Sequence, residues 1–227
     1  MYQPVEFQEH DDKFVSGLVA AHPFGVIVGA GHTGLGAAHL PFQFVQENGV
    51  RVLEGHGAIR NEWLASLQDG AEVIVIFSGA HSYITPGVYQ AEPDVPTWNY
   101  TAVHVRGRYR RLPESDIAGV LERTVQHNEA GVMGSGWSTS SMSVADLRSL
   151  ARGVIAFRID TIDVSAGRKL SQDKLQADVD AVEAHLSACP HSGAREVAED
   201  MRTAEVVGRS GAPSTDPGEW LGPLTEE

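Results

Sequence analysis

The alternation of apolar and polar residues along the chain predicts a mainly β fold. Strand-like apolar runs cover residues 24–31, 34–45, 51–57, 72–79, 99–112 and 153–167. Only "HTG" separates the first two runs, which is typical of an antiparallel hairpin. Helices do not alternate regularly with these strands. The pattern therefore favours an antiparallel barrel with peripheral helices over a parallel doubly wound sheet.

Helical spacing of apolar residues predicts the surrounding helices. One begins after Asp11 and ends before Pro23, because proline interrupts helical hydrogen bonding. The others are expected within residues 61–70, 113–131, 143–151 and 171–188. From Pro190 onward little periodicity remains. We therefore expect one domain over residues 1–187 and a loosely ordered tail over residues 188–227.

Composition and charge narrow the classes of partner. The 227 residues include 17 basic and 30 acidic side chains, which gives a formal net charge of −13. Such a chain is repelled by phosphate backbones and anionic lipid surfaces, so direct DNA or membrane binding is not expected. No basic signal region or long apolar run is visible, and the single cysteine, Cys189, forms no internal disulfide. These features predict a cytoplasmic protein.

Four histidines fall inside or beside the predicted strands: His39, His56, His81 and His104. None has the spacing of a zinc site, but a single axial ligand to haem iron needs no spacing motif. The sequence "LEGHGAIRNEW" makes His56 the first choice, because glycines on both sides leave room for a planar macrocycle. A structural, hydrogen-bonded histidine is the alternative at each position.

The stretch "SAGRKLSQDK" can bind an anion. We expect a turn at Gly167, followed by two cations, a hydroxyl and an amide that could hold a phosphate, a propionate or a carboxylate. These groups belong to Lys169, Ser171, Gln172 and Lys174. The alternative is a capped helix start with Ser171 as the N-cap. By contrast, "GAGHTGLG" precedes another strand rather than a helix, so we do not expect a dinucleotide site there.

Two aromatic residues lie where the strand in "VPTWNYTAVHVRG" begins. Alternation puts Trp98 and Tyr100 on one face and Asn99 on the other, after Pro96, which stands before strand pairing starts. Such a face could stack a flat cofactor, with the asparagine as a polar edge. Packing in the core explains the rings equally well.

Several long motifs resemble one family. They include "AAHPFGVIV", "EGHGAIRNEW", "VIFSGAHSYITPGVY", "VPTWNYTAVHVRG", "GVIAFRIDTID" and "GRKLSQDK". The chain resembles the PaiB-like proteins, described as FMN-binding negative transcriptional regulators. This resemblance implies an FMN-binding split barrel with peripheral helices, and a homodimer with cofactor clefts at the subunit interface.

Differences from the flavin-binding members of that family change which cofactor we expect. The flavin-binding members have an arginine at the position of Ile59 and a proline at that of Glu62, and the loop before Trp98 is short here. The loop is similar to that of the haem-dependent piperazate synthases, which form a nitrogen–nitrogen bond in N5-hydroxyornithine. The resemblance therefore implies haem b, with His56 as the iron ligand, and an amino-acid-like substrate; FMN binding, with a regulatory or redox role, is the alternative.

The same resemblance suggests roles for other residues. Lys169 and Tyr83 would be catalytic. The cofactor would contact His56, Arg60, Asn61, Trp98, Asn99, Tyr100, Ser171, Gln172 and Lys174.

Overall fold

The computed structural model describes residues 1, 4–32, 34–91, 95–129, 134 and 136–208. The strands are β1 (Gln8–Glu9), β2 (Phe24–Gly31), β3 (Gly34–Glu47), β4 (Val50–Ala58), β5 (Glu72–Ile84), β6 (Thr97–Arg111) and β7 (Val154–Lys169). The α-helices are α1 (Asp12–Ala21), α2 (Glu62–Ser66), α3 (Glu114–Asn128), α4 (Val144–Ala151), α5 (Gln176–Ser187) and α6 (Ser192–Thr203). Short 3-10 turns are η1 (Val5–Phe7), η2 (Pro86–Val88) and η4 (Thr139–Ser141).

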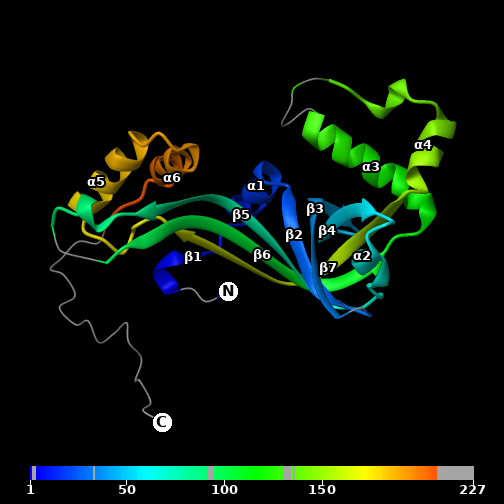
Figure 1. The fold of residues 1–227 in the computed structure, drawn as a ribbon, viewed down its shortest axis with the longest axis horizontal. Helices are drawn as coiled ribbons and strands as arrows, with labels where there is room; N and C mark the ends of the chain where they lie inside the picture. Colours follow the sequence, from blue (N-terminus) through cyan, green and yellow to red (C-terminus); the bar gives the residue numbers. More distant parts are fainter. Residues whose placement is uncertain (2–3, 33, 92–94, 130–133, 135, 209–227) are drawn as a thin grey trace, which may run out of the picture. The chain divides into compact units, whose positions relative to one another are not determined.

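The strands form one sheet that closes on itself (Figure 1). Their order is β1-β7-β4-β3-β2-β5-β6, and β6 also pairs with β7. The pairs β2–β3, β2–β5, β3–β4 and β4–β7 are all antiparallel. The expected mainly β split-barrel class with peripheral helices is confirmed, including the hairpin between β2 and β3.

The chain divides into two compact units. Unit 1 comprises Met1–Pro4, Gln8–Gly79 and Thr101–Arg168. Unit 2 comprises Val5–Phe7, Ala80–Tyr100 and Lys169–Glu227. In the described part of the chain, no helix is long and apolar enough to cross a membrane.

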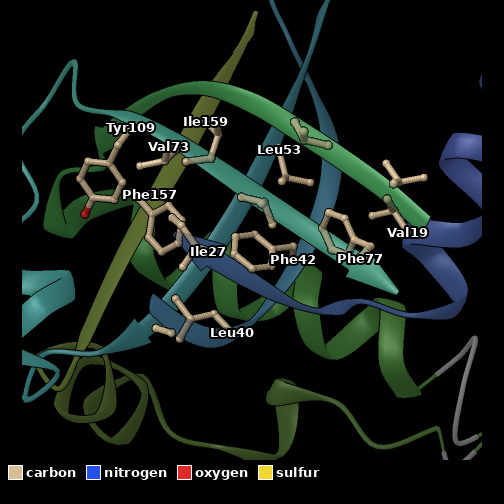
Figure 2. Packing of buried hydrophobic residues seen from close by; sticks show 14 of the residues in the cluster. Val19, Ile27, Leu40, Phe42, Leu53, Val73, Phe77, Tyr109, Phe157 and Ile159 are labelled. Carbon is tan, nitrogen blue, oxygen red and sulfur yellow. The ribbon is translucent and has the colours of Figure 1, made fainter. Parts of the chain in front are cut away.

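The core of unit 1 lies inside the closed sheet (Figure 2). Phe157 is fully buried, and its ring packs against Phe42 and Tyr109 at centroid distances of 5.9 and 5.1 Å. Alternation explains why the strands supply these side chains, because every second residue of a strand points inward. Apolar residues of α1 and α2, together with the residue that follows α2, join the same cluster: Val15, Leu18, Val19, Leu64 and Leu67.

Tyr109 carries a hydroxyl that has no hydrogen-bond partner among the described residues. Its side chain is buried, and burial raises the pKa of the phenol to about 12. An unpaired buried hydroxyl is unfavourable. We therefore expect Tyr109→Phe to raise the free energy of unfolding by about 1 kcal/mol in urea titrations. A loss of that size would show that the hydroxyl is hydrogen-bonded after all.

The same phenol also predicts a dependence on alkaline pH. The folded state holds the phenol proton of Tyr109 more tightly than the unfolded state does. The stability that depends on this proton is therefore fully present below pH 10 and is lost as pH rises toward about 12. Tyr109→Phe should remove that part of the alkaline loss of stability.

A cluster of charges fixes α3 to the sheet in unit 1. Glu54 of β4 is buried and accepts hydrogen bonds from Arg123 of α3 at 2.9 and 2.8 Å and from Arg158 of β7 at 3.1 and 2.9 Å. Burial raises the pKa of Glu54, but the two guanidinium groups outweigh it and hold the pKa below its ordinary value. Arg158 also pairs with Glu47, which pairs with Arg110. Three arginines and their carboxylates thus connect α3 with four strands.

Unit 2 has a separate apolar cluster built largely by α5 and α6. Its buried members are Ala80, Ile84, Leu170, Val179, Val182, Leu186, Ala194, Val197, Ala198 and Met201. The expected loose tail after residue 187 is therefore wrong for Ser192–Thr203, which forms a packed helix. The spacing 194, 197, 198 and 201 puts one small apolar stripe on a single helix face. Residues 209–227 of that expected tail lie outside the described residues.

Candidate functional site

The predicted site residues fall in different units. His56, Arg60 and Asn61 belong to unit 1, and the others belong to unit 2. The second group comprises Tyr83, Trp98, Asn99, Tyr100, Lys169, Ser171, Gln172 and Lys174.

In unit 2, three rings form an exposed aromatic surface, made by His81, Tyr83 and Trp98. The centroid of the Trp98 ring lies 6.1 Å from that of His81 and 6.1 Å from that of Tyr83, which meets it edge-on. Half of Trp98 (53%) and of Tyr83 (50%) is accessible to solvent. The core-packing alternative is therefore wrong for Trp98. An exposed indole with two flanking rings can stack on a flat molecule.

Asn99 lies on the other face of β6. It is completely buried, and its amide donates to the Ser171 hydroxyl at 2.9 Å. The opposite orientation of Trp98 and Asn99 is as predicted, but Asn99 does not provide an accessible polar edge. Tyr100 is half-buried at the next position on the face of Trp98.

The polar residues of "KLSQDK" are engaged within unit 2. Lys169 Nζ donates to Thr97 Oγ1 at 2.8 Å and lies 5.2 Å from the centroid of the Phe7 ring. Gln172 accepts from the backbone N–H of Leu170 at 2.6 Å. Ser171 is 1% exposed. Lys174 pairs with Asp173 at 2.9 Å. These contacts stabilise the segment itself, and Lys169 retains ammonium hydrogens beyond the one that it donates to Thr97.

The backbone differs from both sequence-based interpretations of this stretch. Gly167 pairs with Gln8 inside β7 instead of forming a turn. Ser171 is not an N-cap, because α5 begins only at Gln176. Instead Ser171 adopts a φ of 69°, which is uncommon for a residue other than glycine. The Asn99–Ser171 hydrogen bond helps to hold this turn.

Asp178 holds the segment that precedes the aromatic strand. Its buried carboxylate accepts from the backbone N–H groups of Gln90 and Ala91 at 2.6 and 2.9 Å. Sequence reasoning missed this residue because it lies 87 and 88 positions from its partners. The sequence marks Asp178 only as an acidic residue in the first turn of a helix. Acidic residues are common at that position whether or not they bind a distant backbone segment.

His56 in unit 1 does not have the surroundings expected of a haem ligand. Burial lowers the pKa of its imidazole, which favours the neutral form that can bind iron. However, Nδ1 is buried without a hydrogen-bond partner among the described residues, whereas ligand histidines usually donate this proton to an acceptor.

The glycines beside His56 do not leave space for a macrocycle. A Cβ atom at Gly55 would lie 2.8 Å from Phe42 and 2.9 Å from Phe157, and one at Gly57 would lie 2.6 Å from Leu64. Core side chains therefore occupy the room that we assigned to haem. These glycines allow close packing of the core on the face of β4 opposite His56, so they give no sign of a slot for the macrocycle beside the imidazole.

Arg60 and Asn61 follow the end of β4. Asn61 caps α2, and its side chain accepts from the N–H of Leu64 at 3.0 Å. Arg60 is exposed and makes no side-chain hydrogen bond or ion pair with the described residues. It can contact an anion, but the geometry of unit 1 gives no further sign of a ligand beside it.

A cavity in unit 1 offers a different kind of surface. An open hollow of about 380 Å³ lies between the end of β2 and the segment from the last residue of α2 to Ala71, with the lining residues Ala30, Gly31, His32, Ser66, Gln68, Asp69, Gly70 and Ala71. No Phe, Tyr or Trp is among its described lining residues, so it is less suited to an isoalloxazine ring than the exposed aromatic surface. Over the described ranges, no group of three His, Cys, Asp or Glu side chains could hold a metal ion.

Comparisons with known proteins agree with this architecture. Residues 1–163 match the family described as "Putative FMN-binding domain". The chain is 30% identical over 205 residues to the Protease synthase and sporulation protein PAI 2 of Bacillus subtilis, a match that covers 88% of this chain and 96% of the relative.

Two solved structures share the fold at low identity. The FAD and heme binding protein from Mycobacterium smegmatis matches with a TM-score of 0.53 and 15% identity, over 97% of this chain and 93% of that one. The flavocytochrome Anf3 from Azotobacter vinelandii matches with a TM-score of 0.52 and 13% identity, over 71% and 69%. Both matches support the fold alone.

Proposed function

Since the chain belongs to the FMN-binding domain family, which it shares with the PAI 2 protein, we propose that it binds FMN on the exposed aromatic surface of unit 2. The observation that carries this proposal is the half-exposed Trp98 ring between His81 and Tyr83. The isoalloxazine system of FMN is flat and aromatic. Stacking it on Trp98 would remove apolar area of both rings from water.

The neighbouring charge suits the other end of FMN. Lys169 donates to Thr97, which begins β6 and lies on the Asn99 face of the strand, and an ammonium group with unused hydrogens would bind a phosphate that extends from Trp98 around this strand end. The proposal therefore assigns the ring to Trp98, Tyr83 and His81, and the phosphate to Lys169. In this role Lys169 binds the cofactor and is not the catalytic acid of the haem hypothesis.

FMN would supply one-electron and hydride-transfer chemistry when bound. The side chains around Trp98 would orient its ring and leave one face open to a small molecule. This corresponds to a flavin-dependent redox protein. Any regulatory effect would act without direct DNA contact, because the net charge of −13 repels a phosphate backbone. Haem-dependent N–N bond formation is the poorer proposal, because the glycines beside His56 serve core packing and the buried Nδ1 of its imidazole has no hydrogen-bond acceptor among the described residues.

The test is a titration of the purified, cofactor-free chain with FMN, followed by flavin fluorescence. Trp98→Ala should weaken binding at least about tenfold, because removing the stacked indole costs about 1.4 kcal/mol or more. Trp137→Ala is the matched control: Trp137 is a similarly exposed tryptophan, at 47%, in unit 1. It should leave the affinity unchanged.

Two results would contradict the proposal. One is the absence of FMN binding by the folded wild-type chain at about 100 μM, since a specific cofactor site is expected to bind far more tightly. The other is equal weakening by Trp98→Ala and Trp137→Ala, which would exclude a specific role for Trp98. A haem absorption spectrum in the purified protein would instead favour the haem hypothesis.

A further inference from the structure

Strands β3 and β4 of unit 1 are joined by a two-residue turn, Asn48–Gly49. Glu47 pairs with Val50 across this turn, and both central residues have a positive φ, 51° for Asn48 and 78° for Gly49. These values are typical of a type I′ hairpin turn, in which asparagine followed by glycine is a preferred pair. The fold therefore explains the dipeptide, and the same two residues are also able to react with each other.

The reaction joins the backbone nitrogen of Gly49 to the side-chain amide carbon of Asn48. The new bond closes a five-membered cyclic imide, and the amide nitrogen of Asn48 leaves as ammonia together with the proton from the Gly49 nitrogen. Water then opens the imide at one of its two carbonyl groups, which gives aspartate or isoaspartate. Glycine favours the attack, because it has no Cβ atom to hinder the approach to its nitrogen.

The turn is open enough for this reaction. Asn48 and Gly49 are exposed, and a Cβ atom at Gly49 would meet no described atom within 4 Å. The Asn48 amide has no hydrogen-bond partner among the described residues, so its side chain can rotate toward the Gly49 nitrogen. A turn with few contacts opens locally at a low free-energy cost, which lets the backbone leave the type I′ geometry and form the imide.

The other three asparagines of the chain are held by hydrogen bonds. Asn61 and Asn128 bond to backbone groups at 3.0 and 2.8 Å. Asn99 is buried and bonds to the Ser171 hydroxyl at 2.9 Å. In the sequence none of these three precedes a glycine. The residue type, the following glycine and the unbonded amide therefore coincide at Asn48.

Asp69 provides a matched position within the chain. It is also followed by a glycine, and an aspartate can form the same imide by losing water. Its carboxylate, however, accepts a hydrogen bond from the backbone N–H of Arg111 at 2.7 Å. This bond restrains the side chain that would have to rotate, so Asp69 should react more slowly than Asn48.

Either product would disturb the charge cluster next to the turn. Glu47 directly precedes Asn48 and pairs with Arg110 and Arg158. Isoaspartate inserts an additional carbon into the backbone, so a two-residue turn no longer fits the pairing of Glu47 with Val50. Aspartate adds a carboxylate beside Glu47, in a chain whose net charge is already −13.

We propose that Asn48 is a site of spontaneous deamidation, and that its modification loosens the β3–β4 turn and lowers the stability of the ageing protein. The site lies in unit 1, so the inference is independent of the flavin site proposed in unit 2.

The experiment stores the purified full chain in mildly alkaline buffer at body temperature for several weeks and maps its peptides by mass spectrometry. Asn48 should be converted at least about tenfold faster than the other three asparagines. An enzyme that methylates isoaspartyl carboxylates should label the peptide that contains residue 48 more strongly than the peptide of Asp69. The thermal midpoint of the stored protein should lie about 2–4 °C below that of fresh protein.

Asn48→Gly is the control variant. It removes the reacting side chain but retains a residue that readily adopts a positive φ, so the turn should persist. Its thermal midpoint should stay constant during the same storage. Equal conversion of all four asparagines, or stored wild type with Asn48 intact, overturns the modification site. A modified wild type with an unchanged midpoint, or an equal loss of stability in Asn48→Gly, overturns the loosening of the turn.

Discussion

Replacing Glu54 with glutamine should lower the free energy of unfolding by about 3 kcal/mol. Glu54 is buried where Arg123 and Arg158 converge, and its four charge-assisted hydrogen bonds are between 2.8 and 3.1 Å long. The amide preserves the shape but removes the negative charge, so two guanidinium groups lose their shared partner. Urea unfolding monitored by circular dichroism measures the change.

A surface ion pair provides the control for this prediction. Glu199 bonds to Arg202 but is exposed, so Glu199→Gln should cost less than about 1 kcal/mol. If Glu54→Gln and Glu199→Gln lowered the free energy of unfolding equally, burial would not make the Glu54 ion pairs more stabilising than a surface pair.

The contribution of the Glu54 carboxylate to stability should depend on pH in the acid range. Because the pKa of Glu54 is lowered in the folded state, its contribution is complete above the ordinary value of 4.5 and is lost as pH falls through the lower folded value. The difference between wild type and Glu54→Gln should therefore shrink below pH 4.5. A difference that stays constant with acidification would contradict this account.

Phe157→Ala should lower the free energy of unfolding by about 3–5 kcal/mol, at least as much as Glu54→Gln does. Phe157 is fully buried inside the closed sheet, and Phe42 and Tyr109 pack on its ring (Figure 2). The shorter side chain would leave a cavity between strands that cannot collapse without breaking their pairing. Thermal and urea unfolding both measure this loss.

The same strand offers a matched comparison. Ile162 is 53% exposed on β7, so Ile162→Ala should change stability by less than about 0.5 kcal/mol. Phe157→Leu retains most of the buried volume and should fall between the two alanine variants. A loss below about 1 kcal/mol for Phe157→Ala would mean that the core rearranges to fill the space.

Strand alternation explains why most of the fold was predictable. The pattern in residues 99–112 and 24–31 identifies inward side chains directly, and β6 and β2 lie there. The helix α6 was missed because the segment is polar on average, although its buried residues 194, 197, 198 and 201 recur at helical spacing. The charged side chains between these positions make the two faces distinct, so the spacing was a readable signal that the overall polarity outweighed.

The candidate site was less predictable, because it depends on which face of a strand becomes covered. Alternation separated Trp98 from Asn99, but it could not say that Ser171 and Met201 of α6 lie against Asn99 while Trp98 stays exposed. Similarly, the glycines around His56 were interpreted as ligand space, whereas Phe42 and Leu64 fill it. Such long-range contacts have no local signal in the chain.

The position of β7 in the sheet has a consequence for synthesis of the protein. This strand pairs with β1, β4 and β6, yet it begins only at Val154. Until the ribosome has released it, β4 and β6 each keep an unpaired edge, and Glu54 lacks Arg158. The nascent chain therefore carries exposed strand edges through most of its translation, a state in which chaperone binding would protect it from aggregation.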